Sequence, residues 1–251
     1  MMKKLIILLF TVFLSVGSLS AQSTDVKKLI QQANQGDADA QNKLGIAYAN
    51  GQGVPQDYVQ AVKWFRLAAD QGGAKYQYNL GLAYAKGQGV PQDYVQAVKW
   101  FRLAAYQGDA QGQYSLGVMY DNGEGVPQDY AQAVKWYRLA AGQGLAAAQF
   151  NLGVMYADGE GVPQDYAQAV KWFRLAAGQG NASAQYNLGV MYRKGQGVPQ
   201  DDAQAHMWFN LAAAQGNENG KKNRDLITQI MTPQQIAQAQ ELARNWKPKK
   251  K

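Results

Sequence analysis

Two observations predict that the protein is all-α, an α/α solenoid of stacked helix pairs. The phrase GQGVPQDY begins at Gly51 and returns, with at most one substitution, at 87, 123, 159 and 195, a constant spacing of 36 residues. Each period holds two helix-length segments separated by Gly- and Pro-containing connectors. Self-similarity at this period is typical of a repeat architecture. Because one helix pair cannot bury both of its faces, successive pairs must stack in series.

The repeats fill the middle of a chain of 251 residues that is 47% hydrophobic and 17% charged, a composition that favours a folded protein over a disordered one. We expect a signal peptide over 1–21, an N-terminal capping helix over 22–36, a C-terminal capping helix pair over 217–246 and a basic tail over 247–251. Between them the five repeats are predicted over 37–72, 73–108, 109–144, 145–180 and 181–216.

The first segment has the three-part form of a secretory signal peptide. Lys3 and Lys4 precede an apolar run over 5–16, and small residues follow it. A run of about 12 apolar residues is too short to span a bilayer, which needs roughly 20. We expect cleavage after Ser20 or Ala21, no membrane span in the mature chain, and a periplasmic or secreted protein of the bacterial envelope; a short N-terminal core helix is the alternative. The chain has no cysteine and therefore no disulfide and no thiolate zinc site.

The net charge of +7 does not predict a nucleic-acid-binding face. Lys3, Lys4 and the four lysines of the 247–251 tail hold six of the 25 basic residues, which leaves 19 basic against 18 acidic residues in the rest of the chain. Nucleic-acid-binding proteins concentrate Lys and Arg on one face of the fold. We therefore interpret the tail as a solvated end, with attraction to an anionic envelope surface as the alternative.

The repeated phrase is interpreted as a connector that stops one helix and caps the next. In the second repeat a first helix ends at Gly87, and Pro91 cannot continue it through the loop. Asp93 with Gln96 three residues later is a capping-box pattern for the second helix. Second helices end before a Gly that can take the left-handed conformation, as at Gly72. A phosphate-binding loop, the alternative, would need a third Gly or a Gly-Lys-Ser/Thr that the phrase lacks.

Each helix has one face that barely changes between repeats. Positions are numbered from the first residue of each predicted repeat. In the first helix, positions 2, 5, 8, 9 and 12 share one arc and are predicted to pack against neighbouring helices. Position 9 is Gly, which costs about 1 kcal/mol relative to Ala inside a helix, so its recurrence predicts that a neighbouring helix approaches closely there. In the second helix, a Trp follows an Ala by three residues and is predicted to be core, with sugar or base stacking as the alternative. These tryptophans are Trp64, Trp100, Trp136, Trp172 and Trp208.

The pattern Ala-x-x-Gln-Tyr-Asn-Leu-Gly-x-x-Tyr, Gly-x-Gly-Val-Pro-x-Asp, Ala-x-x-Trp and Ala-Ala-x-x-Gly resembles the Sel-one-like repeat (SLR) family, a relative of the tetratricopeptide repeat. The resemblance covers 37–216 and a terminal helix that opens with MTPQQ at Met231. It implies a right-handed superhelix that serves as a protein-binding scaffold, in bacteria frequently exported and linked to envelope maintenance, signalling or host contact. A cysteine-rich subgroup is associated with penicillin binding and weak β-lactamase activity; this chain departs from it by having no cysteine.

By analogy with tetratricopeptide repeats, the other arc of the first helices, positions 3, 6, 7, 10, 13 and 14, lines the concave side. Residues there differ between repeats, which indicates either binding specificity or mere solvated variation. Position 6 is mostly aromatic, as suits an interface or a partial core, and position 7 is often Asn, which can hold an extended peptide backbone or satisfy a neighbouring loop. The predicted contact residues are Tyr78, Asn79, Lys86, Tyr114, Asp121, Asn122, Phe150, Asn151, Asp158, Tyr186, Asn187, Arg193 and Lys194.

The sequence predicts no catalytic, cofactor-binding or metal-binding residues. The single histidine, His206, stands where other repeats have Val and is interpreted as a packing variation, because one His without partners is a poor metal site. No serine lies in a nucleophile-elbow setting. We therefore expect a scaffold for a protein or extended peptide, with no nucleic acid and no cofactor. The alternatives are a binder or weak hydrolase of cell-wall or β-lactam ligands and a modulator of a cell-wall enzyme.

Overall fold

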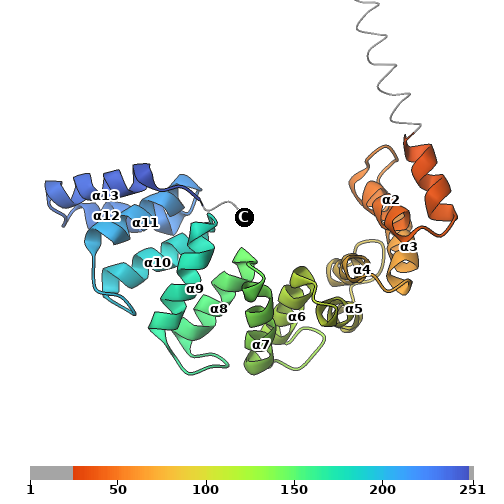
Figure 1. Ribbon diagram of the computed structural model, residues 1–251, viewed down its shortest axis with the longest axis horizontal. Coiled ribbons are helices and arrows are strands. Elements are labelled where there is room, and N and C mark those ends of the chain that lie inside the picture. Colours follow the sequence, from red (N-terminus) through yellow and green to blue (C-terminus); the bar gives the residue numbers. More distant parts are fainter. Residues whose placement is uncertain (1–24, 249–251) are drawn as a thin grey trace, which may run out of the picture. The chain divides into compact units, whose positions relative to one another are not determined.

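The computed structural model describes residues 25–248, and this part of the chain is helical without a strand (Figure 1). The predicted signal peptide and the last three lysines of the tail lie outside the described residues. A helix over 25–34 comes first. The helices that follow are α2 (Ala38–Asn50), α3 (Tyr58–Asp70), α4 (Ala74–Lys86), α5 (Tyr94–Tyr106), α6 (Ala110–Asn122), α7 (Tyr130–Gly142), α8 (Ala146–Asp158), α9 (Tyr166–Gly178), α10 (Ala182–Lys194), α11 (Asp202–Ala214), α12 (Glu218–Thr228) and α13 (Pro233–Asn245). The predicted all-α architecture of repeated helix pairs is confirmed.

The chain divides into two compact units, with the boundary after Gly112 in α6. Within each unit the two helices of a repeat pack on each other: α2 on α3 and α4 on α5 in the first unit, α8 on α9 and α10 on α11 in the second. The second helix of a repeat then packs on the first helix of the next, as α3 does on α4 and α9 on α10. At the C-terminal end, α12 and α13 both pack on α11.

The connector between the two helices of a repeat is held by side chains of the repeated phrase. After α4, Gly87 takes the left-handed conformation with φ 64°. Gln92 Nε2 donates to the carbonyl of Ala85, 2.8 Å away, and Asp93 Oδ1 accepts from the backbone N–H of Gln96 at 3.0 Å, so this carboxylate caps α5 as predicted. The complete reciprocal capping box is formed by Thr232 at the start of α13. The repeated aspartates are therefore structural.

The predicted packing arc of the first helices is confirmed at its centre. In α4, Gln77, Leu80 and Gly81 are buried. The glycine at position 9 lets the second helix of the same repeat come close: a Cβ on Gly153 would lie 2.7 Å from the ring of Phe173. The same contact recurs in every repeat, because the ring is always supplied by the residue that follows the tryptophan.

The tryptophans of the second helices are not the main core residues, which corrects the prediction. Trp136 is buried, whereas the other four are half-buried. The next residue is the aromatic core residue in each repeat, at most 7% exposed: Phe65, Phe101, Tyr137, Phe173 and Phe209. In α3 the buried residues Ala61, Val62, Ala68 and Ala69 lie on one arc of the helix. Because successive residues are about 100° apart, Phe65 lies near the middle of this arc and Trp64 lies at its edge.

A ladder of glutamines links the stacked repeats. The Gln at position 5 of each first helix is buried, and Gln185 is 0% exposed. Gln185 Nε2 donates to the carbonyl of Ala177 in the preceding repeat at 3.3 Å, and Gln185 Oε1 accepts from Gln215 Nε2 of its own repeat at 2.7 Å. Gln149 makes the same two contacts one repeat earlier, to Ala141 and Gln179. Because a buried amide must be hydrogen-bonded, these bonds fix how each of the last two repeats sits on the repeat before it within the second unit.

Candidate partner-binding face

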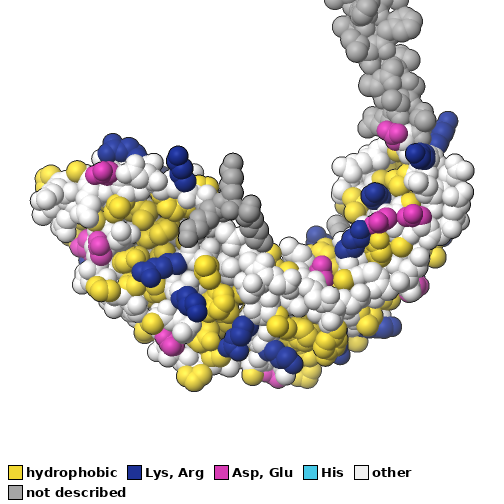
Figure 2. All heavy atoms as spheres, in the orientation of Figure 1, with side chains coloured by type: hydrophobic (Ala, Val, Ile, Leu, Met, Phe, Trp, Pro, Cys, Tyr) yellow, Lys and Arg dark blue, Asp and Glu magenta, His cyan; other side chains and the backbone are white. Residues whose placement is uncertain are grey.

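The thirteen predicted contact residues lie on the first helices α4, α6, α8 and α10, and none of them is buried. We call positions 3, 6, 7, 10, 13 and 14 of these helices the first-helix face. The four residues at position 14 are exposed: Lys86, Asn122, Asp158 and Lys194. Over the second unit, hydrophobic side chains lie interspersed with Lys and Arg side chains on the surface that Figure 2 shows. On the first-helix face itself, position 6 provides an aromatic ring in each of the four helices, and positions 13 and 14 provide charged groups.

The aromatic residues at position 6 are half-buried, because each packs on the core ring of its own repeat. Tyr78 lies against Phe101 with ring centroids 5.9 Å apart, and Phe150 lies against Phe173 at 6.0 Å. Tyr186 packs on Phe209 in the same way. The aromatic stripe is thus part of the core on one side and part of the surface on the other, which combines the two interpretations that the sequence left open.

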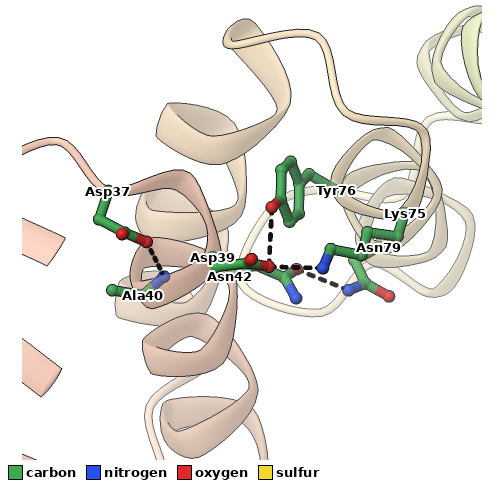
Figure 3. A network of polar contacts seen from close by, with 7 residues as sticks. All are labelled: Asp37, Asp39, Ala40, Asn42, Lys75, Tyr76 and Asn79. Carbon is green, nitrogen blue, oxygen red and sulfur yellow. Dashed lines mark hydrogen bonds and ion pairs between the residues drawn. The ribbon is translucent and has the colours of Figure 1, made fainter.

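The asparagine at position 7 of α4 links neighbouring first helices. Asn79 Nδ2 donates to Oδ1 of the buried Asn42 on α2 at 2.7 Å (Figure 3). Beside this pair, Asp39 accepts from Lys75 and from Tyr76 Oη. These hydrogen bonds hold the pKa of the Asp39 carboxyl below its usual value, so it stays ionised. The partner of Asn79 is a side chain on the preceding repeat and not a neighbouring loop.

In the second unit, the structure brings Asp121 to a buried tyrosine. Tyr137 Oη donates to Asp121 Oδ2 at 2.9 Å. Burial and then the Asp121 charge raise the pKa of Tyr137 above its ordinary value, and burial raises the pKa of Asp121 despite that hydrogen bond. Burial also raises the pKa of Tyr114, against a hydrogen bond with Asn151 that lowers it. Three predicted contact residues are thereby joined, with the core of the repeat, in one polar cluster.

Arg193 also pairs with a residue that is found at its position in one repeat only. Its Nη1 lies 3.3 Å from Oδ1 of Asp202 at the start of α11. Asp202 stands where the other four repeats have Tyr, just as Tyr137 stands where the others have Phe. Neither partner, Tyr137 or Asp202, is among the residues predicted from the sequence. The signal that could have found them is the pairing of two departures from the repeat pattern within one repeat.

His206 is buried on α11, as expected for a packing residue. It is 6% exposed, and its Nδ1 has no hydrogen-bond partner. Burial lowers the pKa of His206, and the nearby Arg224 lowers it further while Asp225 opposes the shift. The neutral imidazole is therefore the form that the fold favours. Among residues 25–248, no three His, Cys, Asp or Glu side chains are grouped so that they could hold a metal ion.

We predict that stability falls in mild acid because of this histidine. Since the folded state has the lower pKa, the unfolded chain takes up the proton first as pH drops below about 6.5, and the free energy of unfolding declines from there until the folded-state pKa is reached. His206→Val, the residue of the other four repeats, should remove this decline. Urea titrations at pH 8 and pH 5 measure it; an equal decline in both proteins would show that His206 is not its cause.

Comparison with known families identifies the repeats. The Sel1 repeat model matches residues 38–73, 74–109, 110–145, 146–181 and 182–217, each one residue later than the predicted unit. These five matches cover more than half of the chain. A search of curated proteins found no match. In the described residues, no helix combines the length and the apolar character needed to cross a bilayer.

Several solved structures share the fold. A protective antigen of uropathogenic Escherichia coli, described as an SLR fold, is 40% identical with a TM-score of 0.81; the alignment covers 89% of this chain and 48% of that one, so this chain spans about half of that protein's length. A Sel1 repeat protein from Oxalobacter formigenes is 32% identical with a TM-score of 0.77 and coverage of 93% and 95%. An immunity protein from Pseudomonas aeruginosa, 22% identical over 83% of this chain and 81% of its own with a TM-score of 0.51, shares the fold alone.

Proposed function

The chain belongs to the Sel1 repeat family, and on that premise we propose that it is an exported, non-catalytic scaffold that binds a protein or an extended peptide. The partner would lie along the first-helix face, on the concave side of the solenoid. The family is one of protein-interaction scaffolds, and the chain is a repeat protein of this class. The residues of the first-helix face indicate which kind of partner would bind.

One observation carries this proposal: exposed residues of the face change charge from helix to helix, while the buried residues beside them do not change. Position 14 is Lys86 in α4, Asp158 in α8 and Lys194 in α10, all exposed. Position 8 is Leu and position 9 is Gly in every repeat, and every one of these leucines is 0% exposed. Charges that no internal contact requires are available for electrostatic complementarity with a partner, which sets specificity and association rate.

Export is supported by the basic, apolar and small-residue order of residues 1–21. It also fits the 40% identity to a protein described as a protective antigen. Expression of the full chain in a bacterial host, fractionation and intact mass measurement test it: we expect a periplasmic or secreted product that begins at Ala21 or Gln22. A cytoplasmic product that retains Met1 would contradict export.

Partner capture tests the face itself. The variants Lys86→Glu, Asp158→Lys and Lys194→Glu reverse exposed charges without touching the core, so helical content and melting temperature should stay unchanged. We expect crosslinked capture from the organism's envelope extract to fall about tenfold or more in the triple variant, the loss that follows from about 1.4 kcal/mol of binding free energy. Lys63→Glu, an exposed lysine on the second helix α3, is the matched control and should capture as the wild type does.

Two results would overturn the proposal. Capture that survives the triple variant and is lost in Lys63→Glu would move the binding surface to the second helices. The mature protein could also turn over a chromogenic β-lactam or muropeptides. Sustained turnover that one point mutation removes would show that the protein is an enzyme and not a non-catalytic scaffold.

A further inference from the structure

The first unit has a hollow of about 210 Å³ that is lined by residues of α2, α3 and α4, and the α4 part of the first-helix face contributes to this lining. Its apolar lining includes Ile46 of α2, Leu82 of α4, and Val62 and Phe65 of α3. Asn79 and Lys86, two of the predicted contact residues, provide polar groups in its lining. An apolar cavity of about 150 Å³ binds benzene, so this hollow is large enough for one leucine or phenylalanine side chain.

The hollow exists because of a small residue at position 11 of α4. This residue is Ala83, which lines the hollow. In the last three repeats position 11 is methionine, namely Met119, Met155 and Met191, and all three are buried. Met155 packs in one cluster with Val134 and Tyr137, the counterparts of Val62 and Phe65. A methionine side chain thus fills in the later repeats the space that the second repeat leaves open.

Lys86 is the one charged residue among those that line the hollow. α2 and α4 together carry Lys43, Lys75 and Lys86 against the single Asp39. Asp39 is already paired with Lys75. Lys86 is exposed, and within residues 25–248 it forms no ion pair. An incoming carboxylate would therefore find an unpaired ammonium at the edge of the apolar hollow.

The position 7 amide completes the set of groups that an extended peptide needs. Asn79 uses one N–H on Asn42, and a carboxamide has a second N–H and a carbonyl oxygen with which to hold a peptide backbone. The apolar walls, the amide and the ammonium therefore match a side chain, its backbone and an adjacent carboxylate in turn.

We propose that this hollow binds one leucine- or phenylalanine-sized side chain of an extended peptide segment, with an acidic neighbour in that segment paired to Lys86. The inference rests on the proposed function, since it names what the first-helix face recognises in its partner. It assigns selectivity for an acidic–apolar sequence to the hollow that the first two repeats form, because Ala83 at position 11 of α4 leaves space there.

The test uses the mature protein and fluorescein-labelled peptides of the sequence Gly-Ser-Glu-Leu-Glu-Ser-Gly, with Leu replaced by Ala or both Glu replaced by Lys. Fluorescence anisotropy should show that each change weakens binding about tenfold, because the hollow then lacks its apolar occupant or Lys86 lacks its counter-charge. Ala83→Met should abolish the preference for Leu over Ala, since it fills the hollow with the residue of later repeats. Lys86→Glu, at an exposed site, should invert the preference between Glu- and Lys-flanked peptides.

Ala131→Leu is the matched control, since it enlarges an exposed alanine on the second helix α7 and should change neither preference. A leucine preference that persists in Ala83→Met, or a charge preference that persists in Lys86→Glu, would overturn the proposal, as would equal binding of all peptides by the wild type. If the peptides fail while partner capture still depends on the exposed position 14 charges, the hollow is wrong and the scaffold stands. If leucine selectivity is found and partner capture is unaffected by those charges, the hollow binds a peptide side chain as proposed, and the assignment of the partner to the first-helix face is wrong.

Discussion

Phe173→Ala should lower the free energy of unfolding by about 3–5 kcal/mol, the loss that follows from truncating a fully buried aromatic ring. Phe173 is 1% exposed, and its ring packs on Phe150 at a centroid distance of 6.0 Å. On another side the ring fills the space left by the missing Cβ of Gly153. Since a glycine has no side chain that could move into the void, the cavity would stay open and the loss should lie at the upper end of this range.

Trp172→Ala is the informative comparison. Trp172 is larger than Phe173 but only half-buried, at the edge of the packing arc of α9. Its loss should cost about 1–2 kcal/mol. Urea denaturation followed by far-UV circular dichroism measures both values. A greater loss for Trp172 than for Phe173 would restore the tryptophans as the core residues.

Period, helix bounds and caps could be predicted from the sequence, because Gly, Pro and Asp at fixed spacing each have a local conformational effect. The choice between Trp172 and Phe173 could not, since adjacent residues differ by only about 100° on a helix and both can face a partner helix. The burial of Val170 and Ala177 on the same arc decides it in favour of Phe173.

The candidate site was less predictable for a different reason. Variation between repeats located the first-helix face, but a single residue's variation does not reveal its partner. Asp121 bonds Tyr137 and Arg193 pairs with Asp202, so these two are bound within the protein, whereas Lys86 and Asp158 are exposed. The hollow beside Lys86 arises from Ala83, at a position that was predicted for neither face. Only packing of three helices in space shows that a missing methionine leaves an opening.

The second glycine of the repeated phrase should be nearly as sensitive as the core. Gly161→Ala is expected to lower the free energy of unfolding by about 2–4 kcal/mol, from left-handed strain and steric conflict together. Gly161 has φ 69°, and a Cβ there would overlap the backbone carbonyl of Tyr130 at the start of α7. The atoms that this Cβ would meet belong to the backbone of Tyr130 and Ala131 and not to a flexible side chain. The overlap can therefore be removed only if the loop moves away from α7.

Gly142→Ala is the matched control, with the opposite sign expected. Gly142 is the last residue of α7, it is exposed, and nothing lies within 4 Å of the position that a Cβ would take. Alanine there should stabilise the protein by about 0.5–1 kcal/mol through helix propensity and reduced freedom of the unfolded chain. Urea denaturation of the two variants side by side separates loop contact from a general effect of replacing glycine. If Gly161→Ala unfolds at the wild-type urea concentration, the loop does not need to lie against α7, and the double glycine of each connector loses its structural explanation.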